Sequence, residues 1–522
     1  MVDINTFPFE KTKFELLKNF SYGNNWPVVY IQEDGQEMYI GQTTDVYTRS
    51  LQHYENPLRA KLKRIHILTD NEFNMSAAYD LESLLIQYIS ADGIFKLQNG
   101  NGGLINHNYY EKEKYLAKLE TVWPKLKEKS LVKEDLSKIR NSEFFKFSPY
   151  KALMSDQLLV AEKLEDEIKK LEQNTYIVHG GPGTGKSVLA IYLLKRLKEN
   201  LETKDLDIAL LIPMSSLRST LTRVVKRVPG LGAEMIIGPS DLSRKTYDLL
   251  IVDEAHRLSR RINLSNYPNY EATNAQLGLK KDATQLDWIM KTSKQQILFY
   301  DEGQNVIPKD VRPSDFKHLK AQHYILLSQL RVEGGENYLE FIDDLFSLKN
   351  SYHKFSDKYD FKIYDDLNNM IIDIKKHDKN HSLSRVVAGY AWPWKTKKGK
   401  QDYDIEIDGL KLVWNSTNID WVNSPNAINE VGCIHTIQGY DLNYAGVIIG
   451  PEISYDKENN SLIVDEKKYM DINGKRSITD PDELKQYIIN IYKTLLTRGI
   501  KGTYVYIVDA ALREKFKKLN EF

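Results

Sequence analysis

A run of eight residues has the types and spacing needed to hold a polyphosphate. It fits the pattern G-x-x-x-x-G-K-[ST] and consists of Gly180, Gly181, Pro182, Gly183, Thr184, Gly185, Lys186 and Ser187. Glycines let backbone N–H groups curl around phosphates without a Cβ in the way, and the helix that follows adds its positive end. We expect Lys186 to reach the β- and γ-phosphates of ATP and Ser187 to supply a hydroxyl to Mg²⁺.

Two adjacent carboxylates follow a second apolar segment. The stretch 248–256 reads DLLIVDEAH, so Asp253 and Glu254 stand where a buried strand would end. Asp253 would hold Mg²⁺ through water, and Glu254 would orient and deprotonate the attacking water. Paired with the phosphate loop upstream, these carboxylates predict hydrolysis of ATP and not only its binding.

The N-terminal part of the chain contains a second set of groups suited to phosphate chemistry. Cleaving a phosphodiester requires a base for the attacking water, a cation opposite the developing charge, and a hard metal ion on the leaving oxygen. Glu82 suits Mg²⁺, and Arg49 offers a planar fork to a phosphate. Tyr39, assisted by Tyr30 and His53, is the candidate base; which phenol deprotonates water stays open. The alternative is structural, with the tyrosines as cross-strand partners and Glu82 as a solvated helix residue.

Short elements must position these groups. We expect, after a helical lead at 11–20, strands at 27–31 and 37–41 joined by a hairpin, helices at 45–54 and 76–90, and a glycine-rich turn at 97–103. The first of these two helices carries Arg49 and His53 one turn apart, and the second carries Glu82. Four basic residues on a further expected helix suit contact with a nucleic-acid backbone, although an ordinary charged face would look the same: Arg59, Lys61, Lys63 and Arg64.

This N-terminal stretch resembles the GIY-YIG nuclease domain. Its two signature triplets appear as VVY at 28–30 and YIG at 39–41, so the first has lost its Gly-Ile but keeps the tyrosine. The resemblance implies a metal-dependent endonuclease with Glu82 as the metal ligand. It further implies catalytic roles for Tyr30, Tyr39, Arg49, His53, Glu82 and the closing Asn99.

Later residues resemble the motifs of superfamily 1 helicases. The glutamine at 157 would read the adenine edge, and two arginines of a second lobe would reach the γ-phosphate. A T-x-Q-G arrangement begins at Thr436. Each residue alone has a plain alternative, a surface glutamine or a surface salt bridge. The resemblance implies nucleotide-directed roles for Gln157, Gln304, Arg331, Gln438, Gly439 and Arg498. From about residue 149 onward, with the segment AGYAWPW, the chain resembles a bacterial family of Schlafen-group DNA/RNA helicase-like ATPases.

Strands that alternate with helices predict parallel sheets covered on both faces. The fold class we predict is therefore α/β, with a small α+β GIY-YIG nuclease-like domain followed by two RecA-like P-loop NTPase lobes. We expect the small domain at 1–108, a helical linker interrupted by Pro124 at 109–145, the first lobe at 146–345 and the second at 346–522. An insertion at 257–292 mixes cations with aromatics, as a single-strand contact would, or is an ordinary exposed loop: Arg260, Arg261, Tyr267 and Tyr270.

Composition narrows the class of protein. Lys+Arg and Asp+Glu are 72 each, so the net charge of zero gives no sign of a nucleic-acid partner, and any basic surface must be local. The single cysteine, Cys433, excludes an intramolecular disulfide and a cysteine-rich zinc site. The chain shows neither a basic-then-apolar leader nor a run of about 18 apolar residues, so we expect a cytoplasmic protein with no membrane partner.

These features together predict an ATP-dependent nucleic-acid nuclease with ATP and Mg²⁺ as cofactors, acting on DNA in preference to RNA. By its architecture it would fit a bacterial phage-defence effector, with a homo-oligomer or a defence-system protein as further partner candidates. Two other functions stay open: an ATP-gated nucleic-acid-binding switch without cleavage, and a DNA repair helicase.

Overall fold

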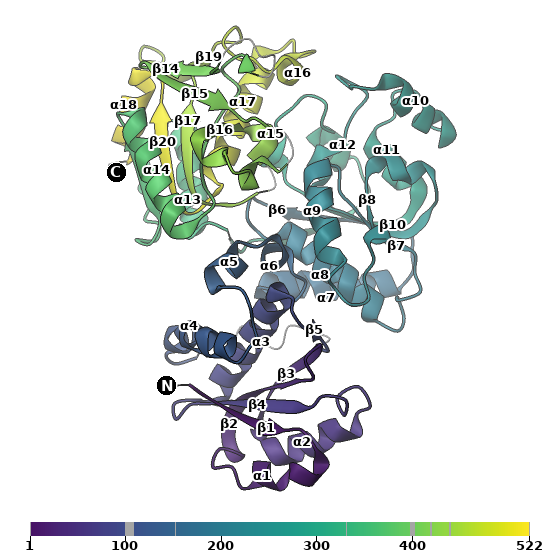
Figure 1. Cartoon of the computed structure of the whole chain (residues 1–522). Helices are drawn as coiled ribbons and strands as arrows, with labels where there is room; N and C mark the ends of the chain where they lie inside the picture. The colour runs from purple at the N-terminus through teal and green to yellow at the C-terminus, as the bar shows by residue number, and fades with distance from the viewer. Residues whose placement is uncertain are drawn as a thin grey trace. The chain divides into compact units, whose positions relative to one another are not determined.

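The computed structural model describes residues 2–99, 109–151, 153–329, 331–396, 402–417, 420–437 and 440–520 (Figure 1). The chain divides into two compact units, Met1–Leu159 and Val160–Phe522. Two of the predicted site residues, Gln438 and Gly439, lie outside the described residues. Within those described ranges, no helix is both long enough and apolar enough to cross a membrane.

The first unit contains a five-stranded sheet in the order β1-β4-β2-β3-β5. Its strands are β1 (Asp3–Pro8), β2 (Asn24–Glu33), β3 (Glu37–Asp45), β4 (Arg64–Thr69) and β5 (Lys96–Leu97). β2 and β3 form the predicted hairpin, whose turn uses Gly35 at φ +94°. An edge strand, β1, precedes the predicted helical lead, which is reduced to a 3-10 turn and α1 (Glu15–Lys18).

Two helices of this unit, α2 (Val46–Glu55) and α3 (Met75–Asp92), lie against the sheet, and three others, α4 (Lys112–Glu128), α5 (Leu136–Asn141) and α6 (Glu143–Phe147), lie against α3 (Figure 1). Asp45 caps α2 by accepting a hydrogen bond from the Thr48 N–H, and Asn74 caps α3 through the Ala77 N–H. α3 packs on β2 and β3, which brings the predicted glutamate at 82 to the sheet that carries the two tyrosines.

The segment predicted as a linker is packed structure. α4, α5 and α6 pack on α3, and the rings of Trp123 and Phe145 both contact the ring of Tyr88. The predicted break at Pro124 is wrong, because α4 runs through it. Proline removes one helical hydrogen bond. Burial of Trp123 and Leu126 on either side of Pro124 holds the helix in place.

The second unit contains two sheets, and we call each sheet with its helices a lobe. The first sheet has six strands, all parallel, in the order β11-β6-β10-β9-β7-β8. The strands are β6 (Thr175–Gly180), β7 (Ile208–Leu211), β8 (Ile236–Ile237), β9 (Tyr247–Val252), β10 (Ser293–Tyr300) and β11 (Gln322–Leu326). The helices are α7 (Ser155–Lys169), α8 (Lys186–Glu199), α9 (Ser215–Val225), α10 (Tyr267–Gln276), α11 (Gln285–Thr292) and α12 (Pro313–Lys317). β7 and β9 are apolar over most of their length, as expected of a sheet buried on both faces.

The second sheet has seven strands in the order β12-β20-β17-β13-β16-β15-β14, and only the pair β14–β15 is antiparallel. The strands are β12 (Asp360–Tyr364), β13 (Ser384–Ala388), β14 (Ile405–Ile407), β15 (Leu410–Trp414), β16 (Glu430–Cys433), β17 (Leu442–Ile449) and β20 (Gly499–Ile507). Also in this lobe are the hairpin β18 (Ile453–Asp456) and β19 (Ser461–Val464), and the helices α13 (Gly335–Phe346), α14 (Leu367–His381), α15 (Ile434–Ile437), α16 (Ile472–Lys475), α17 (Pro481–Leu496) and α18 (Ala510–Asn520).

The predicted α/β class with parallel sheets is confirmed, and it decides where polar residues gather. In parallel sheets the carboxyl ends of neighbouring strands meet at one edge, where ligands bind. In the first lobe β6 ends at the phosphate loop, β9 at Asp253 and β10 at Asp301. α13 packs against α17, and its residues Tyr338 and Phe341 belong to the hydrophobic core of the second lobe. The domain boundaries predicted from the sequence place these two residues in the first lobe.

Candidate nucleotide and nucleic-acid sites

The phosphate loop joins β6 to α8, and its glycines meet a backbone requirement. Gly183 and Gly185 have φ values of +82° and +77°, which residues with a Cβ rarely adopt. The buried Nζ of Lys186 donates to two carbonyl oxygens of the loop, at 2.6 and 2.9 Å, and to Asp301 Oδ2 at 3.0 Å. Asp301 is therefore a partner of the lysine that the loop motif alone does not reveal.

Asp253 is fully buried at the end of β9. Its Oδ1 accepts the Glu254 N–H at 3.0 Å, Ser187 hydrogen-bonds to its side chain, and Oδ2 has no hydrogen-bond partner among the residues described. Burial, and then the charge of Glu254, raise the pKa of Asp253. A buried carboxylate oxygen without a partner, beside a serine hydroxyl, fits Mg²⁺, which prefers hard oxygen ligands.

Glu254 follows with a strained backbone and an ionised side chain. Its φ of +54° lies in the left-handed region that is uncommon outside glycine. Oε2 lies 2.9 Å from Nε2 of the buried His256. Burial opposes ionisation, but the pairing with His256 and the charges of Lys186 and Arg498 hold the pKa of Glu254 below its usual range. A carboxylate in this state can accept a proton from water.

Arg498, just after α17, connects the second lobe to the first. Its side chain is 1% exposed, and Nη2 donates to Gln304 Oε1 at 3.3 Å. Gln304 in turn donates from Nε2 to Asp301 Oδ2 at 2.6 Å, the same oxygen that Lys186 contacts. Burial, and then the charge of Arg331, lower the pKa of Arg498 to about 10, so its guanidinium stays charged at neutral pH. The structure thus brings Arg498 and Gln304 to the phosphate loop.

Arg331 reaches the same region from the connection between β11 and α13. Its Nε lies 2.5 Å from Asp441 Oδ1 of the second lobe. Two residues earlier, Gln329 donates from Nε2 to the carbonyl oxygen of Pro182 at 2.6 Å. A Cβ on Gly183 would stand 2.1 Å from Gln329 Oε1 and 2.7 Å from the Arg331 Cβ. The connection therefore lies directly on the phosphate loop, and Gln329 and Asp441 belong to the site although no sequence motif singled them out.

Two other predicted residues make local contacts. Gln157 is buried in the first turn of α7, and its Oε1 accepts the Met154 N–H at 2.9 Å. Thr436 in α15 donates from Oγ1 to the carbonyl oxygen of Cys433 at 3.0 Å. Both bonds hold a chain turn in place. Thr436 also lines the cavity described next.

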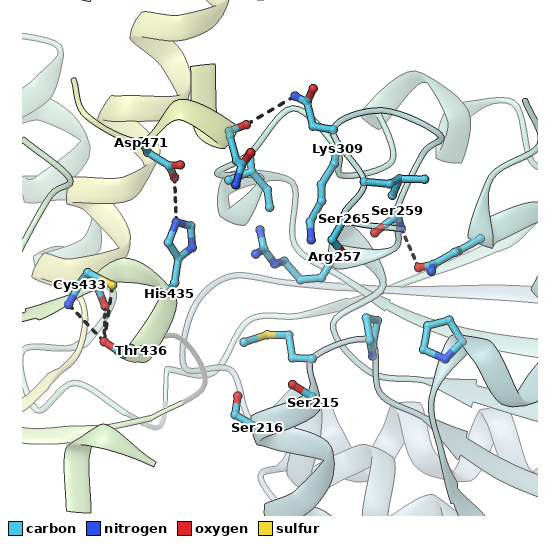
Figure 2. Close-up of a pocket in the computed structure, with 18 of the residues that line it drawn as sticks. Ser215, Ser216, Arg257, Ser259, Ser265, Lys309, Cys433, His435, Thr436 and Asp471 are labelled. Atoms are coloured by element: carbon cyan, nitrogen blue, oxygen red, sulfur yellow. Dashed lines mark hydrogen bonds and ion pairs between the residues drawn. The ribbon is translucent and has the colours of Figure 1, made fainter. Parts of the chain in front are cut away.

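A cavity of about 770 Å³ lies between the two lobes (Figure 2). His435 and Asp471 of the second lobe face Arg257 and Lys309 of the first, and Ser215 at the start of α9 lies below them. His435 Nε2 is 2.8 Å from Asp471 Oδ2. Among the described residues that line it, the Lys and Arg side chains outnumber the acidic ones: Arg218, Arg257, Lys309 and Arg476 against Asp471. A cavity with this excess of positive charge suits a phosphate backbone.

A compact cluster forms between β2, β3 and α2 of the first unit. Tyr30 Oη lies 2.6 Å from His53 Nε2, and Arg49 Nε donates to Tyr30 Oη at 3.3 Å. The rings of Tyr39 and His53 meet edge to face at 5.0 Å. Gly41 permits this arrangement, since a Cβ there would stand 2.3 Å from Tyr30 Oη. The structure therefore brings these four predicted side chains together.

Arg59 joins this cluster, although the sequence placed it in a basic helix. That helix is wrong: the segment after α2 forms turns until β4 begins at Arg64. The Arg59 guanidinium lies 3.3 Å from the centroid of the Tyr39 ring, and Nη1 contacts His53 Nδ1 at 2.9 Å. Guanidinium can only donate, so Nδ1 is the acceptor and the His53 proton sits on Nε2, facing Tyr30. Burial, and then the charges of Arg59 and Arg49, lower the pKa of His53 to about 3.

Of the two other residues predicted for the nuclease site, Glu82 is a half-buried carboxyl and Asn99 binds the backbone. Glu82 on α3 is half-buried, and burial raises its pKa to about 7 against the lowering effect of Arg49. Asn99 uses both ends of its amide on the backbone of Ile40, at 3.0 and 2.8 Å, and so holds the strand that carries Tyr39. Within the described ranges no group of three or more His, Cys, Asp or Glu could hold a metal ion. Glu82 fits Mg²⁺ as a single carboxylate ligand, because this ion keeps several waters and also takes substrate phosphates.

Two lobes of parallel sheet, a phosphate loop with its carboxylates, and an arginine from the opposite lobe define a helicase-like P-loop ATPase fold. Residues 173–509 match the family model described as Schlafen group 3, DNA/RNA helicase domain. The chain belongs to this family.

The chain is also similar to a yeast protein and aligns weakly with solved structures. The uncharacterized protein YPL245W of Saccharomyces cerevisiae is 29% identical over 381 residues, which cover 65% of this chain and 83% of the yeast protein. The Pif1 helicase from Candida albicans aligns at 11% identity and a TM-score of 0.28, covering 71% of this chain and 99% of that one. The Pif1 helicase from Bacteroides in complex with ADP-AlF3 and ssDNA aligns at 10% identity and a TM-score of 0.30, covering 70% of this chain and 94% of that one. Scores this low do not establish a shared fold.

Proposed function

We propose that this protein is an ATP-dependent nuclease. The second unit hydrolyses ATP while it holds a DNA strand between its lobes, and the first unit cleaves a phosphodiester bond. The observation that carries the proposal is the position of Arg498, which is 1% exposed and bonded to Gln304 of the opposite lobe. An arginine so placed stabilises transition-state charge only while the lobes stay together. Hydrolysis therefore depends on lobe closure.

The chain's own residues supply the steps of ATP hydrolysis. Lys186 and the loop N–H groups bind the β- and γ-phosphates, and Glu254 accepts a proton from the attacking water. Asp253 and Ser187 would hold Mg²⁺, which neutralises charge on the phosphates. Gln304 links Arg498 to Asp301, which also holds Lys186, so its position would depend on whether both cations are in place.

The cavity between the lobes is where we place the strand. Its cations, among them Lys309 of the first lobe and Arg476 of the second, would bind phosphates, and a strand held on both sides links its own position to that of the lobes. Closure around ATP would then move one side of the strand against the other.

In the first unit the residues favour a tyrosine as base. Burial, and then the nearby Tyr39, raise the pKa of Tyr30, so Tyr30 stays protonated and receives hydrogen bonds from His53 and Arg49. Tyr39 is then the candidate base: once its own hydroxyl proton has left to solvent, its phenolate takes a proton from the attacking water, with Arg49 facing the phosphate. Glu82 would hold Mg²⁺, which stabilises charge on the leaving oxygen.

One observation favours a second function, an ATP-gated binding switch without cleavage. Tyr39 is only 9% exposed and lies under the Arg59 guanidinium. If Arg59 stays there when a strand binds, water cannot approach the Tyr39 hydroxyl from that side, and the unit would bind without cutting.

A paired assay separates the two functions. Purified protein is given Mg²⁺, ATP and labelled single- or double-stranded DNA or RNA, and both phosphate release and strand cleavage are followed. We expect Lys186→Ala to lose ATP hydrolysis and Glu82→Gln to lose cleavage alone. Equal cleavage by wild type and Glu82→Gln would dismiss the nuclease. Strand-stimulated ATP hydrolysis with intact strands would establish the switch.

A further inference from the structure

A second, smaller cavity adjoins the cavity between the lobes. It measures about 200 Å³ and lies at the starts of α10 and α11, within the segment inserted after β9. Drug-sized ligands occupy pockets of about 300–1,000 Å³, so this one has room for a single ring-sized group. Five residues line both cavities and make them continuous: Ser240, Leu264, Ser265, Gln285 and Lys309.

The floor of the small cavity is aromatic and rigid. The rings of Tyr270 and Trp288 lie 4.6 Å apart, and both side chains belong to the core of the first lobe. Tyr270 Oη is bonded to the carbonyl oxygens of Ser259 and Ala283, at 2.9 and 3.0 Å. Trp288 donates its indole N–H to Asn274. Such a floor accepts a flat ring with little loss of conformational entropy, because its own side chains are already fixed.

The rim presents amide donors. The Oδ1 of Asn266 accepts the Asn269 N–H at 3.0 Å, and the Oε1 of Gln285 accepts the Ser259 N–H at 2.9 Å. A backbone N–H can only donate, so these bonds fix both amide orientations. The NH₂ groups of Asn266 and Gln285 are then the ends that can donate hydrogen bonds to acceptor atoms of a ligand.

The arginines of the segment inserted after β9 are bonded to other parts of the protein. Arg260 donates to the carbonyl oxygens of Pro308 and Asp310, and Arg261 pairs with Glu271. The single-strand contact through these arginines stays a prediction, and it would require both side chains to exchange these partners for phosphates. Lys309 differs, since it lines both cavities and Figure 2 shows its side chain extending into the space between the lobes. A phosphate where the two cavities meet would contact Lys309. A ring inside the small cavity would contact the amide and aromatic side chains that line it.

We propose that the small cavity is a nucleobase subsite. A strand in the larger cavity turns one base into it, the base lies against Tyr270 and Trp288, and its carbonyl oxygens accept hydrogen bonds from Asn266 and Gln285. Two amide donors suit a base edge with two carbonyl oxygens, such as O2 and O4 of thymine or uracil. Adenine accepts only at its ring nitrogens, so we expect the subsite to bind thymine more tightly than adenine. This inference rests on the proposed strand site between the lobes.

Isosteric variants test the donors without disturbing the fold. Asn266→Asp keeps an oxygen for the helix cap, and Asp caps helices as well as Asn. Gln285→Glu likewise keeps the acceptor for Ser259. The matched control is Gln276→Glu, the same charge change on α10 at a residue that lines neither cavity. The probes are fluorescein-labelled single strands of equal length, oligo(dT) and oligo(dA), at fixed ionic strength.

We expect wild type and Gln276→Glu to share one ratio of oligo(dT) to oligo(dA) affinity, and the double variant Asn266→Asp, Gln285→Glu to lower it about tenfold. Replacing single thymines by abasic sites should weaken binding at one register in wild type and not in the double variant. An unchanged ratio would overturn the subsite while leaving the strand site intact. If wild type binds neither strand, the proposed function fails, and the subsite fails with it.

Discussion

The two candidate sites are assembled in different ways. Around the nucleotide loop, Lys186 meets Asp301 across 115 residues and Gln304 meets Arg498 across 194, from two different sheets. Around Tyr30, the partners lie 19 and 23 residues away, within one hairpin and the helix after it. The first site is therefore complete only while the two lobes are held together, whereas the second is formed between a hairpin and the helix after it, within one unit.

This difference implies two kinds of control. A site divided between lobes can be switched by lobe movement, because its buried arginine leaves when the lobes part. A site formed within one unit, between a hairpin and its following helix, cannot be opened in that way. The N-terminal cluster can be controlled only by a side chain such as Arg59, which covers Tyr39.

The largest effect should follow from breaking the contact between lobes. Arg498→Ala should lower ATP hydrolysis by on the order of 10³-fold, because an arginine against transition-state charge contributes 10³–10⁵ in rate. Nucleotide binding, measured by fluorescent ATP-analogue titration, should persist. Arg498→Lys keeps the charge without the planar fork and should remain deficient. Hydrolysis close to the wild-type rate in a folded Arg498→Ala protein would refute the divided site.

The second-largest effect should be a loss of strand cleavage alone, caused by a change in the first unit. Arg49→Lys should lower strand cleavage by about 10²-fold, because one donor to a developing oxyanion contributes about that much. ATP hydrolysis should stay at the wild-type rate, since the contacts of Arg49 lie within the cluster. Lys138→Ala, on the exposed face of α5 in the same unit, is the control and should cleave normally. A parallel fall in both activities would mean that the two sites are not separate.

Arg59 should have a smaller effect that sharpens the comparison. Arg59→Met keeps the length of the side chain but cannot donate, so His53 loses the donor that keeps its proton on Nε2, and cleavage should fall about tenfold. Nitrogen NMR of the His53 ring reports the tautomer directly and does not require cleavage. We expect a mixture of tautomers in the variant and one in wild type. A single, unchanged tautomer would show that Arg59 does not orient His53.

The smallest effect concerns a buried carboxyl that belongs to neither site. Glu452 is 1% exposed, accepts the Tyr492 hydroxyl, and has a pKa that burial raises to about 7. A folded-state pKa above the unfolded one means that ionisation opposes folding, with no effect below about pH 4.5 and the full effect above about pH 7. Glu452→Gln should therefore raise the free energy of unfolding by about 1–3 kcal/mol at pH 8 and leave it unchanged at pH 4. Thermal melts at both pH values measure this, and an equal gain at both would contradict it.

The sequence predicted best where the chemistry is local in the chain. The phosphate loop, its preceding strand and its following helix are contiguous, so the motif alone predicted their arrangement. The alternation of strands and helices predicted parallel sheets, and membership of the Schlafen group 3 helicase-domain family agrees with the resemblance. The GIY-YIG nuclease assignment stays a prediction.

The predicted secondary structure was wrong where pairing with distant strands overrides the local preference for a helix. Residues 59–64 look helical in charge pattern, yet Arg64 pairs with Glu33 of β2 and with Pro8 of β1, and these ladders start a strand there. Nothing in the sequence indicated that Arg261 pairs with Glu271. A list of residue types cannot show which opposite charge lies within reach.

The sequence by itself determined the chemistry available to this protein: a glycine loop with its lysine and serine, paired carboxylates after a buried strand, and two tyrosines with an arginine and a glutamate. Those depend on residue type and short spacing. The tertiary structure decided which groups meet, since Asp301 reaches Lys186, Gln329 lies on the loop and Arg59 covers Tyr39 only after packing. The physical reason is that contacts between distant residues are set by how buried surfaces fit together, which no short stretch of sequence specifies.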